Sequence, residues 1–486
     1  MRASDTRIRN GSSKTRLSER RFLLLLALYA SQYFGIGFLM TGATAILREK
    51  GVALESMAAV SALGMLWAVK FLWAPVVDRF GRNRAGGHYR SWLLVLQPLL
   101  ACVLAVIACL PDVRAQFGVF LLLAAVYILL SATQDVAADA LAISSIRSDE
   151  RGFANGVQVA GSYIGLIVGG GLTTVIYGWA GWFAALATLA VLTLLPTLLI
   201  AVSPEPPASA EARAARISVN TIWTVVRQRG AGIWMLLVVP ITWMGLTAGY
   251  SLITPSLIDQ GWSAEETATL TTLLAGVCGT AAALGTGVLI QRFGRERVLL
   301  VGCALAVIGM VAFLPVISGV ASTVYIVAVT IVFFLGYTAG SIIVYSINMD
   351  YSRPGSAGSD YTTLASFAML VSFGAGAVSL SVAGQLGYVS VFVGSSILYA
   401  IGAALTVWHQ RRYRTQTLNH GAGRAVLPVA PCCRSSRPLR GPNRSSAPLS
   451  ARLHLTGRNV NAEPGACACS VGGVQCQVVP AEASVV

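Results

Sequence analysis

Long apolar runs separated by short polar segments make up most of this sequence. The runs lie at 22–47, 53–77, 91–110, 117–143, 153–177, 181–202, 231–258, 264–290, 298–317, 321–348, 360–384 and 388–408. A helix needs about 20 apolar residues to cross a hydrocarbon core of about 30 Å, and each run reaches that length. The pattern therefore predicts an all-α membrane protein with twelve transmembrane helices.

Composition agrees with this prediction and excludes an ordinary soluble domain. The chain is 55% hydrophobic and 11% charged, whereas soluble domains contain about 25% charged residues. A formal net charge of +15 would suggest a nucleic-acid partner in a soluble protein, but here the basic residues gather at the termini and in alternate loops. Because basic loops stay in the cytoplasm, we expect both termini to be cytoplasmic and no nucleic acid to bind.

The first run has some features of a signal peptide. Basic residues precede Phe22, and Ala43-Thr44-Ala45 resembles a cleavage site. A signal core has about 7 to 15 apolar residues, and this run is longer. We therefore interpret 22–47 as the first transmembrane helix.

A short charged sequence occurs twice, once after the second run and once after the eighth. Its copies are Asp78-Arg79-Phe80-Gly81-Arg82-Asn83-Arg84 and Gln291-Arg292-Phe293-Gly294-Arg295-Glu296-Arg297. The repeat predicts two pseudo-symmetric halves of six helices each. The expected domains are a basic cytoplasmic N-terminus (1–21), an N-terminal six-helix bundle (22–202), a cytoplasmic central loop (203–230), a C-terminal six-helix bundle (231–408) and a disordered cytoplasmic tail (409–486).

The central loop and the tail leave alternatives open. Residues 217–229 are expected to form either an interfacial helix, with Ile222 and Trp223 toward the lipid headgroups, or a plain linker. After Trp408 the composition changes to Arg, Ser, Pro, Gly and Cys without periodicity, which predicts disorder unless the tail is an altered reading frame.

Glycines inside two of the runs predict close helix packing. They are Gly161, Gly165, Gly169, Gly170 and Gly171 in the fifth run and Gly285 and Gly287 in the eighth. Small residues four apart let membrane helices approach closely. Interfaces that slide as the protein opens and closes are the alternative explanation.

Three charged residues lie deep inside apolar runs of the first half. Lys70 precedes Asp78 by eight residues, which places it roughly 12 Å inside the second run. Asp135 and Asp139 share one face of the fourth helix, and Asp135 lies about 12 Å from its cytoplasmic end. Since a buried charge needs a partner, we predict an ion pair between Lys70 and Asp135. Asp135, Asp139 and Lys70 are proton-coupling candidates; the alternative is that the pair only holds two helices in register.

Other polar and aromatic residues are candidates for lining a substrate cavity. They are Gln32, Tyr33, Gln134, Gln158, Tyr163, Trp243, Tyr250, Tyr337 and Tyr345. Aromatic residues near helix ends also form interfacial belts, which is the alternative for several of them.

The sequence gives no support to an enzyme. The four histidines lie outside the apolar runs, and neither a P-loop nor a Gly-x-Ser-x-Gly motif is present. The tail cysteines match no zinc-module spacing. We expect no catalytic residue, no metal and no cofactor.

The repeated loop resembles the signature of the major facilitator superfamily, Gly-x-x-x-Asp-Arg-x-Gly-Arg-x-Arg. The first copy has Ala74 in place of the glycine, and the second keeps Gly287 but has Gln291 in place of the aspartate. The resemblance implies alternating access, with the substrate site near mid-membrane between the halves. It also implies a gating loop that locks the cytoplasmic side, formed by Asp78, Arg79, Gly81, Arg82, Arg292, Gly294 and Arg295.

Three further stretches resemble the AmpG-related permeases. They are Lys70-Phe71-Leu72-Trp73-Ala74-Pro75, Gln134-Asp135 with Asp139-Ala140, and Glu150-Arg151-Gly152. That group includes muropeptide permeases and siderophore permeases of the RhtX/FptX type. The stretches Gly87-His88-Tyr89-Arg90-Ser91-Trp92 and Asn155-Gly156-Val157-Gln158 are more similar to the siderophore branch.

These observations together predict a monomeric permease of the bacterial inner membrane. Its partners would be protons, the lipid bilayer and a siderophore or ferric-siderophore, which it would import by proton-coupled alternating access. A muropeptide permease is the alternative. A non-transporting membrane receptor or enzyme is the alternative from a different class.

Overall fold

Every secondary-structure element in the described part of the chain is a helix. The computed structural model describes residues 2–43, 46–47, 50, 52, 59–60, 63–80, 87–203, 205, 220–263, 266–267 and 269–422. These helices belong to one compact unit, Met1–Ala425.

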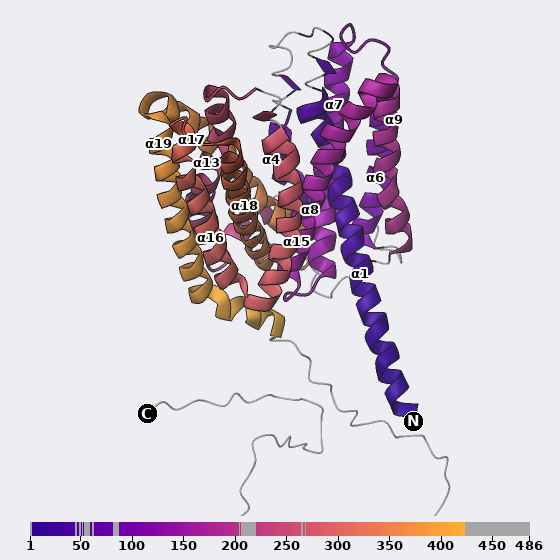
Figure 1. Ribbon diagram of the computed structural model, residues 1–486. Coiled ribbons are helices and arrows are strands. Elements are labelled where there is room, and N and C mark those ends of the chain that lie inside the picture. The colour runs from indigo at the N-terminus through magenta and orange to yellow at the C-terminus, as the bar shows by residue number, and fades with distance from the viewer. Residues whose placement is uncertain are drawn as a thin grey trace, which may run out of the picture. The chain divides into compact units, whose positions relative to one another are not determined.

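The first half contains the helices up to Val202. They are α1 (Arg2–Gly37), the π-helix η1 (Phe38–Gly42), α4 (Met65–Ala68), the 3-10 helix η2 (Lys70–Leu72), α5 (Ala74–Arg79), α6 (His88–Ala108), α7 (Phe117–Ser145), α8 (Arg151–Leu166), the π-helix η3 (Ile167–Leu172) and α9 (Thr173–Val202). Figure 1 shows α1, α6, α7, α8 and α9 grouped on one side of this unit.

The second half begins after the central loop. Its elements are α12 (Ala231–Ile233), the π-helix η4 (Trp234–Val238), α13 (Val239–Asp259), the π-helix η5 (Thr269–Leu274), α15 (Ala275–Phe293), α16 (Arg295–Ala312), α17 (Leu314–Ile317), α18 (Thr323–Tyr351) and α19 (Ala357–Ala422). Figure 1 shows α13, α16, α18 and α19 together on the other side.

Nine helical segments in the described residues are long and apolar enough to cross a membrane. Two of them, Arg151–Val202 and Ala357–Tyr413, each hold two helices that meet at a kink. The kinks lie at Gly181 and Gly387, whose φ angles of 78° and 79° favour glycine. Gly387 lies in the predicted break between the last two runs, and Gly181 directly follows the predicted break at 178–180.

The second predicted helix, 53–77, is the exception to this agreement. Only part of it is described, and that part is divided into α4, η2 and α5 rather than forming one long helix. Pro75 lies at the start of α5, where its missing N–H interrupts the helical hydrogen bonds. The total of twelve transmembrane helices therefore stays a prediction.

Close glycine contacts join α8 and η3 to α1, as the glycine spacing predicts. A Cβ added at Gly165 would lie 2.5 Å from the Ala30 carbonyl oxygen, and one at Gly169 would lie 1.9 Å from that of Phe34. By contrast, nothing lies within 4 Å of a Cβ added at Gly171 or Gly285. These two glycines are therefore not needed for close packing.

The central loop is attached to both halves through its described ends. At its start, Glu205 accepts a hydrogen bond of 2.8 Å from the backbone N–H of Arg90. At its end, residues 217–229 contain a short helix, α11 (Thr221–Val226). Ile222 is buried and Trp223 is exposed, so only the tryptophan faces outward as the interfacial-helix alternative requires.

The predicted disorder after Trp408 is wrong at its beginning. Helix α19 continues to Ala422. His409 is buried and its ring lies 3.1 Å from the Tyr351 hydroxyl and 3.0 Å from the Gly230 carbonyl oxygen. The turn after Trp408 is thus held by contacts of His409 with the end of α18 and with Gly230. Residues 423–486 lie outside the described residues.

Candidate functional site

A cavity of about 180 Å³ lies between the two halves. The first half contributes Tyr33, Trp67, Lys70, Asp135, Asp139 and Gln158, and the second half contributes Trp243, Tyr337, Tyr345, Tyr361, Ala365, Ala368, Met369 and Ser372. Six of these fourteen residues are aromatic, one is basic and two are acidic.

The structure sorts the predicted cavity residues into two sets. Five line the cavity: Tyr33, Gln158, Trp243, Tyr337 and Tyr345. Gln32, Gln134, Tyr163 and Tyr250 do not. These four make other contacts: Gln32 donates to Asp135, Gln134 donates to the Leu28 carbonyl, Tyr163 contacts Thr338, and Tyr250 packs against Tyr337.

Trp67 and Tyr361 are the principal lining residues that sequence reasoning missed. Tyr361 lies one residue after Asp360, near the start of an apolar run, where its aromatic ring has the position of an interfacial residue. Trp67 lies three residues before Lys70, and this spacing on one helix face could have indicated it.

Lys70 and Asp135 form the predicted ion pair. Their side chains are only 6% and 4% exposed, so both charges are largely shielded from water. Asp135 also accepts a hydrogen bond of 2.7 Å from Gln32, and the Lys70 ammonium lies 5.1 Å from the centre of the Trp67 ring. The pair thus connects η2 to α7 with additional hydrogen-bond and cation–π contacts.

Asp139 has a different environment, although it lies one helical turn from Asp135. It is 1% exposed, and its Oδ1 accepts hydrogen bonds from the Tyr29 hydroxyl at 2.8 Å and from Gln158 Nε2 at 3.0 Å. The ion pairs among the described residues include none to Asp139. The two predicted aspartates are therefore held by a cation in one case and by neutral donors in the other.

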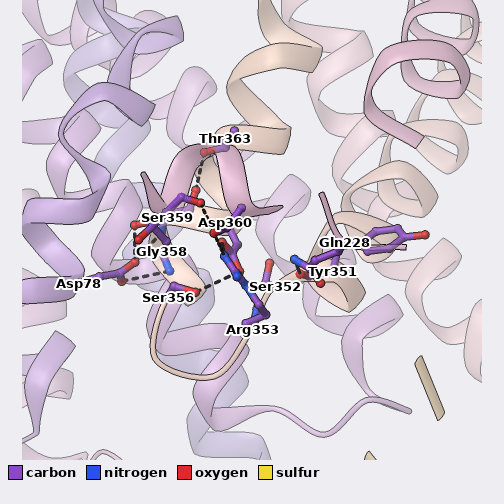
Figure 2. Close-up of polar contacts among 12 residues, drawn as sticks. Asp78, Gln228, Tyr351, Ser352, Arg353, Ser356, Gly358, Ser359, Asp360 and Thr363 are labelled. Atoms are coloured by element: carbon purple, nitrogen blue, oxygen red, sulfur yellow. Dashed lines mark hydrogen bonds and ion pairs between the residues drawn. The ribbon is translucent and has the colours of Figure 1, made fainter. Parts of the chain in front are cut away.

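A second polar cluster connects the halves at the end predicted to be cytoplasmic. Asp78, at the end of α5, accepts hydrogen bonds from the backbone N–H groups of Gly358 and Ser359 and from the Ser359 hydroxyl, at 3.2, 2.7 and 2.6 Å. Tyr89 donates a fourth at 2.9 Å. Figure 2 shows Asp78 beside this first turn of α19. A carboxylate satisfies the free N–H groups at a helix N-terminus and interacts favourably with its dipole.

The loop before α19 is held by an arginine and a buried acid, also drawn in Figure 2. Arg353 donates to both oxygens of Asp360 at 2.7 Å, and Asp360 is fully buried. Arg353 also donates to Thr224 of α11 at 2.8 Å, and Gln228 donates to the Tyr351 carbonyl at 3.0 Å. The end of the central loop is thereby connected to the start of α19.

Asp350 joins the halves at a third position. It pairs with Arg151 of α8 at 2.8 Å and with Arg295 of α16. Of the predicted gating residues, Asp78 thus contacts the other half, whereas Arg295 pairs with Asp350 within the second half. Arg79, Arg292 and Gly294 are exposed, and the described hydrogen bonds and ion pairs include none from them to the other half. Gly81 and Arg82 lie outside the described residues.

Comparison with known proteins identifies the family. A sequence profile of the Major Facilitator Superfamily matches residues 22–379. The chain belongs to the Major Facilitator Superfamily. This membership confirms a multi-pass membrane transporter and agrees with the prediction that the protein is not an enzyme.

Several curated proteins are similar to this chain in sequence. The anhydromuropeptide permease of Escherichia coli (strain K12) is 29% identical over 295 residues, which cover 58% of this chain and 57% of that protein. The putative transporter AmpG 4 of Rickettsia conorii is 28% identical over 126 residues, or 26% of this chain and 30% of that one. The chain thus spans little more than half the length of the first relative and less of the second.

Solved superfamily structures share the fold at low identity. The Escherichia coli fucose:proton symporter FucP has a TM-score of 0.60 at 14% identity, covering 80% of this chain and 98% of its own. A bacterial homologue of the iron transporter ferroportin in an outward-facing state has a TM-score of 0.57 at 14% identity, covering 82% and 100%. Together with the profile, these matches confirm an all-helical superfamily fold.

Proposed function

We propose that this chain is a proton-coupled permease of the bacterial inner membrane that imports a sugar–peptide of the anhydromuropeptide type. The sequence analysis gave a siderophore as the main expected cargo and a muropeptide as the alternative. The proposal reverses this order. The relatives named above are an anhydromuropeptide permease and an AmpG-type transporter, and neither is named for a siderophore.

The observation that carries the proposal is the cavity lined by both halves. Alternating access requires a substrate site that each half contacts, so that a change in their relative tilt exposes it to either side. The aromatic wall suits a sugar ring, whose C–H faces stack on Trp and Tyr, while the charged residues provide partners for a peptide. Both parts of a sugar–peptide thus find complementary chemistry.

The size of the cavity gives a constraint on the transport cycle. Pockets that enclose a drug-sized ligand measure about 300–1,000 Å³, and this cavity measures about 180 Å³. A sugar–peptide therefore requires the halves to separate further than in this conformation. Contacts of Asp78 and Asp350 hold them together at the end predicted to be cytoplasmic, so we expect the widening to occur at the opposite end.

Uptake into proteoliposomes tests the proposal. Purified protein, reconstituted with an inward proton gradient, should accumulate radiolabelled anhydromuropeptide, and a protonophore should abolish the accumulation. Protein-free liposomes and a panel of ferric-siderophores are the controls. Accumulation of a siderophore without the muropeptide would refute the cargo, and no flux of any cargo would refute a permease.

A further inference from the structure

Three hydrogen bonds form a continuous path from the first half to the second. Tyr361 of α19 donates its hydroxyl to Gln158 Oε1 at 3.2 Å, Gln158 of α8 donates its Nε2 to Asp139 Oδ1 at 3.0 Å, and Tyr29 of α1 donates to the same oxygen at 2.8 Å. Only Tyr361 belongs to the second half. The amide of Gln158 therefore connects a buried carboxylate of one half to a side chain of the other.

The path is sensitive to the charge of Asp139. A hydrogen bond to a carboxylate is roughly twice as strong as one to a neutral acceptor. Because the Gln158 amide is planar and polarisable, a stronger bond at its N–H also makes its carbonyl a better acceptor for Tyr361. Lys70 forms its ion pair with Asp135 and acts on Asp139 only through space, so the direct contacts to the Asp139 carboxylate come from the two hydrogen-bond donors.

We propose that Asp139 binds the transported proton and that Gln158 passes its charge state to Tyr361, so that protonation loosens the contact between the halves. This inference rests on the proposed proton-coupled transport. Asp139 takes up one proton from water in the cavity to become a neutral acid and later returns it on the other side. Ionised Asp139 holds the halves together through Gln158, and the neutral acid releases them.

Other charged and titratable groups surround Asp139. Besides Gln158, the groups close enough to interact with it are Lys70, Asp135, Tyr29, Tyr33, Tyr345 and Tyr361. Of these, only Lys70 is basic, and it has Asp135 as its partner. Of the two aspartates that line the cavity, Asp139 is thus the one that can gain or lose a proton without breaking an ion pair.

The Tyr163 hydroxyl supplies a matched control. It also bridges the halves, since it lies 3.4 Å from the Thr338 hydroxyl on α18. It does not line the cavity, and neither aspartate accepts a hydrogen bond from it. Tyr163→Phe and Tyr361→Phe each remove one hydroxyl from an inter-half contact, but only Tyr361→Phe interrupts the path to Asp139.

The test measures the conformation and needs no cargo. Spin labels at Asp149→Cys and Phe293→Cys, two exposed positions on different halves, report the distance between the halves. The protein, with its native cysteines replaced, is reconstituted in nanodiscs and studied by double electron–electron resonance from pH 5 to pH 8. The measured quantity is the equilibrium constant between populations that are closed and open at the end predicted to be cytoplasmic, where both labels lie.

We expect this equilibrium constant to change by about tenfold between pH 5 and pH 8, because protonation turns Asp139 from a charged into a neutral hydrogen-bond acceptor. Asp139→Asn should remove the pH dependence, and Tyr361→Phe and Gln158→Leu should each reduce it to less than about threefold. Tyr163→Phe should keep the full change. Retained pH dependence in Asp139→Asn refutes the proton site, and retained dependence in both Gln158→Leu and Tyr361→Phe refutes the path.

Failure of the cargo proposal gives a different result. If uptake of the muropeptide is absent while the labelled protein responds to pH as expected, the cargo is wrong and the proton site stands. If the unsubstituted protein shows no response to pH, both proton coupling and the path are refuted.

Discussion

Removing either partner of the Lys70–Asp135 pair should destabilise the protein more than removing both. Lys70→Met and Asp135→Asn alone each leave one charge buried without its partner, at a cost of about 3–5 kcal/mol. The double variant leaves no charge, and the amide that replaces Asp135 still offers an acceptor to Gln32. We therefore expect its stability to lie closer to that of the unsubstituted protein, with a coupling energy of about 3 kcal/mol.

Equilibrium unfolding in mixed micelles, followed by tryptophan fluorescence, measures the four free energies of this cycle. The pair Arg147–Asp149 is the matched control, because its N–O distance is 3.1 Å but its side chains are 78% and 68% exposed. Exposed pairs contribute about 0–1 kcal/mol. A coupling energy for the buried pair of less than about 0.5 kcal/mol would mean that the two charges do not interact, and Lys70 would then extend to the membrane interface.

The same double variant separates the roles of the two aspartates. If Asp139 carries the proton, the double variant should still accumulate cargo against a gradient, at a higher half-saturating concentration because two charged lining residues are neutralised, whereas Asp139→Asn should not. If Asp135 carries it, the double variant should fold and bind cargo but fail to accumulate it.

Two further substitutions test the contacts between helices. Asp78→Asn removes the charge that interacts with the N-terminus of α19, so flux should fall by about tenfold while cargo binding persists; equal losses in both assays would point to misfolding. Gly169→Ala forces a methyl group against the Phe34 carbonyl and should cost about 1–3 kcal/mol in the same unfolding assay. Gly285→Ala meets no atom within 4 Å and should be neutral or slightly stabilising; similar effects of the two would contradict the packing argument.

Sequence reasoning succeeded where a single helix carries the information. Depth along a helix follows from counting residues, so the pairing of Lys70 with Asp135 was predictable. The kinks at Gly181 and Gly387 were predictable because one apolar run ends a few residues before each glycine and the next run begins at or directly after it.

Sequence reasoning failed where the hydrogen-bond partner of a residue lies in the other half. The hydrogen bonds of Asp78 reach residues about 280 positions away, and no local pattern indicates them. Membrane helices are apolar on all sides, so periodicity does not decide which aromatic residues face inward. This explains why Tyr250 was chosen as a lining residue and Tyr361 was missed.

The attachments of the central loop imply that the covalent link between the halves is mechanically dispensable. Glu205 is bound to the first half, whereas Thr224 and Gln228 are bound beside α19 of the second. The 16 residues from Glu205 to Asn220 are long enough to extend to roughly 50 Å, so a chain of this length does not restrict rocking motions of a few ångströms. Each loop end moves with its own half, and two separately expressed half-chains divided within 206–219 would retain every described contact between the halves.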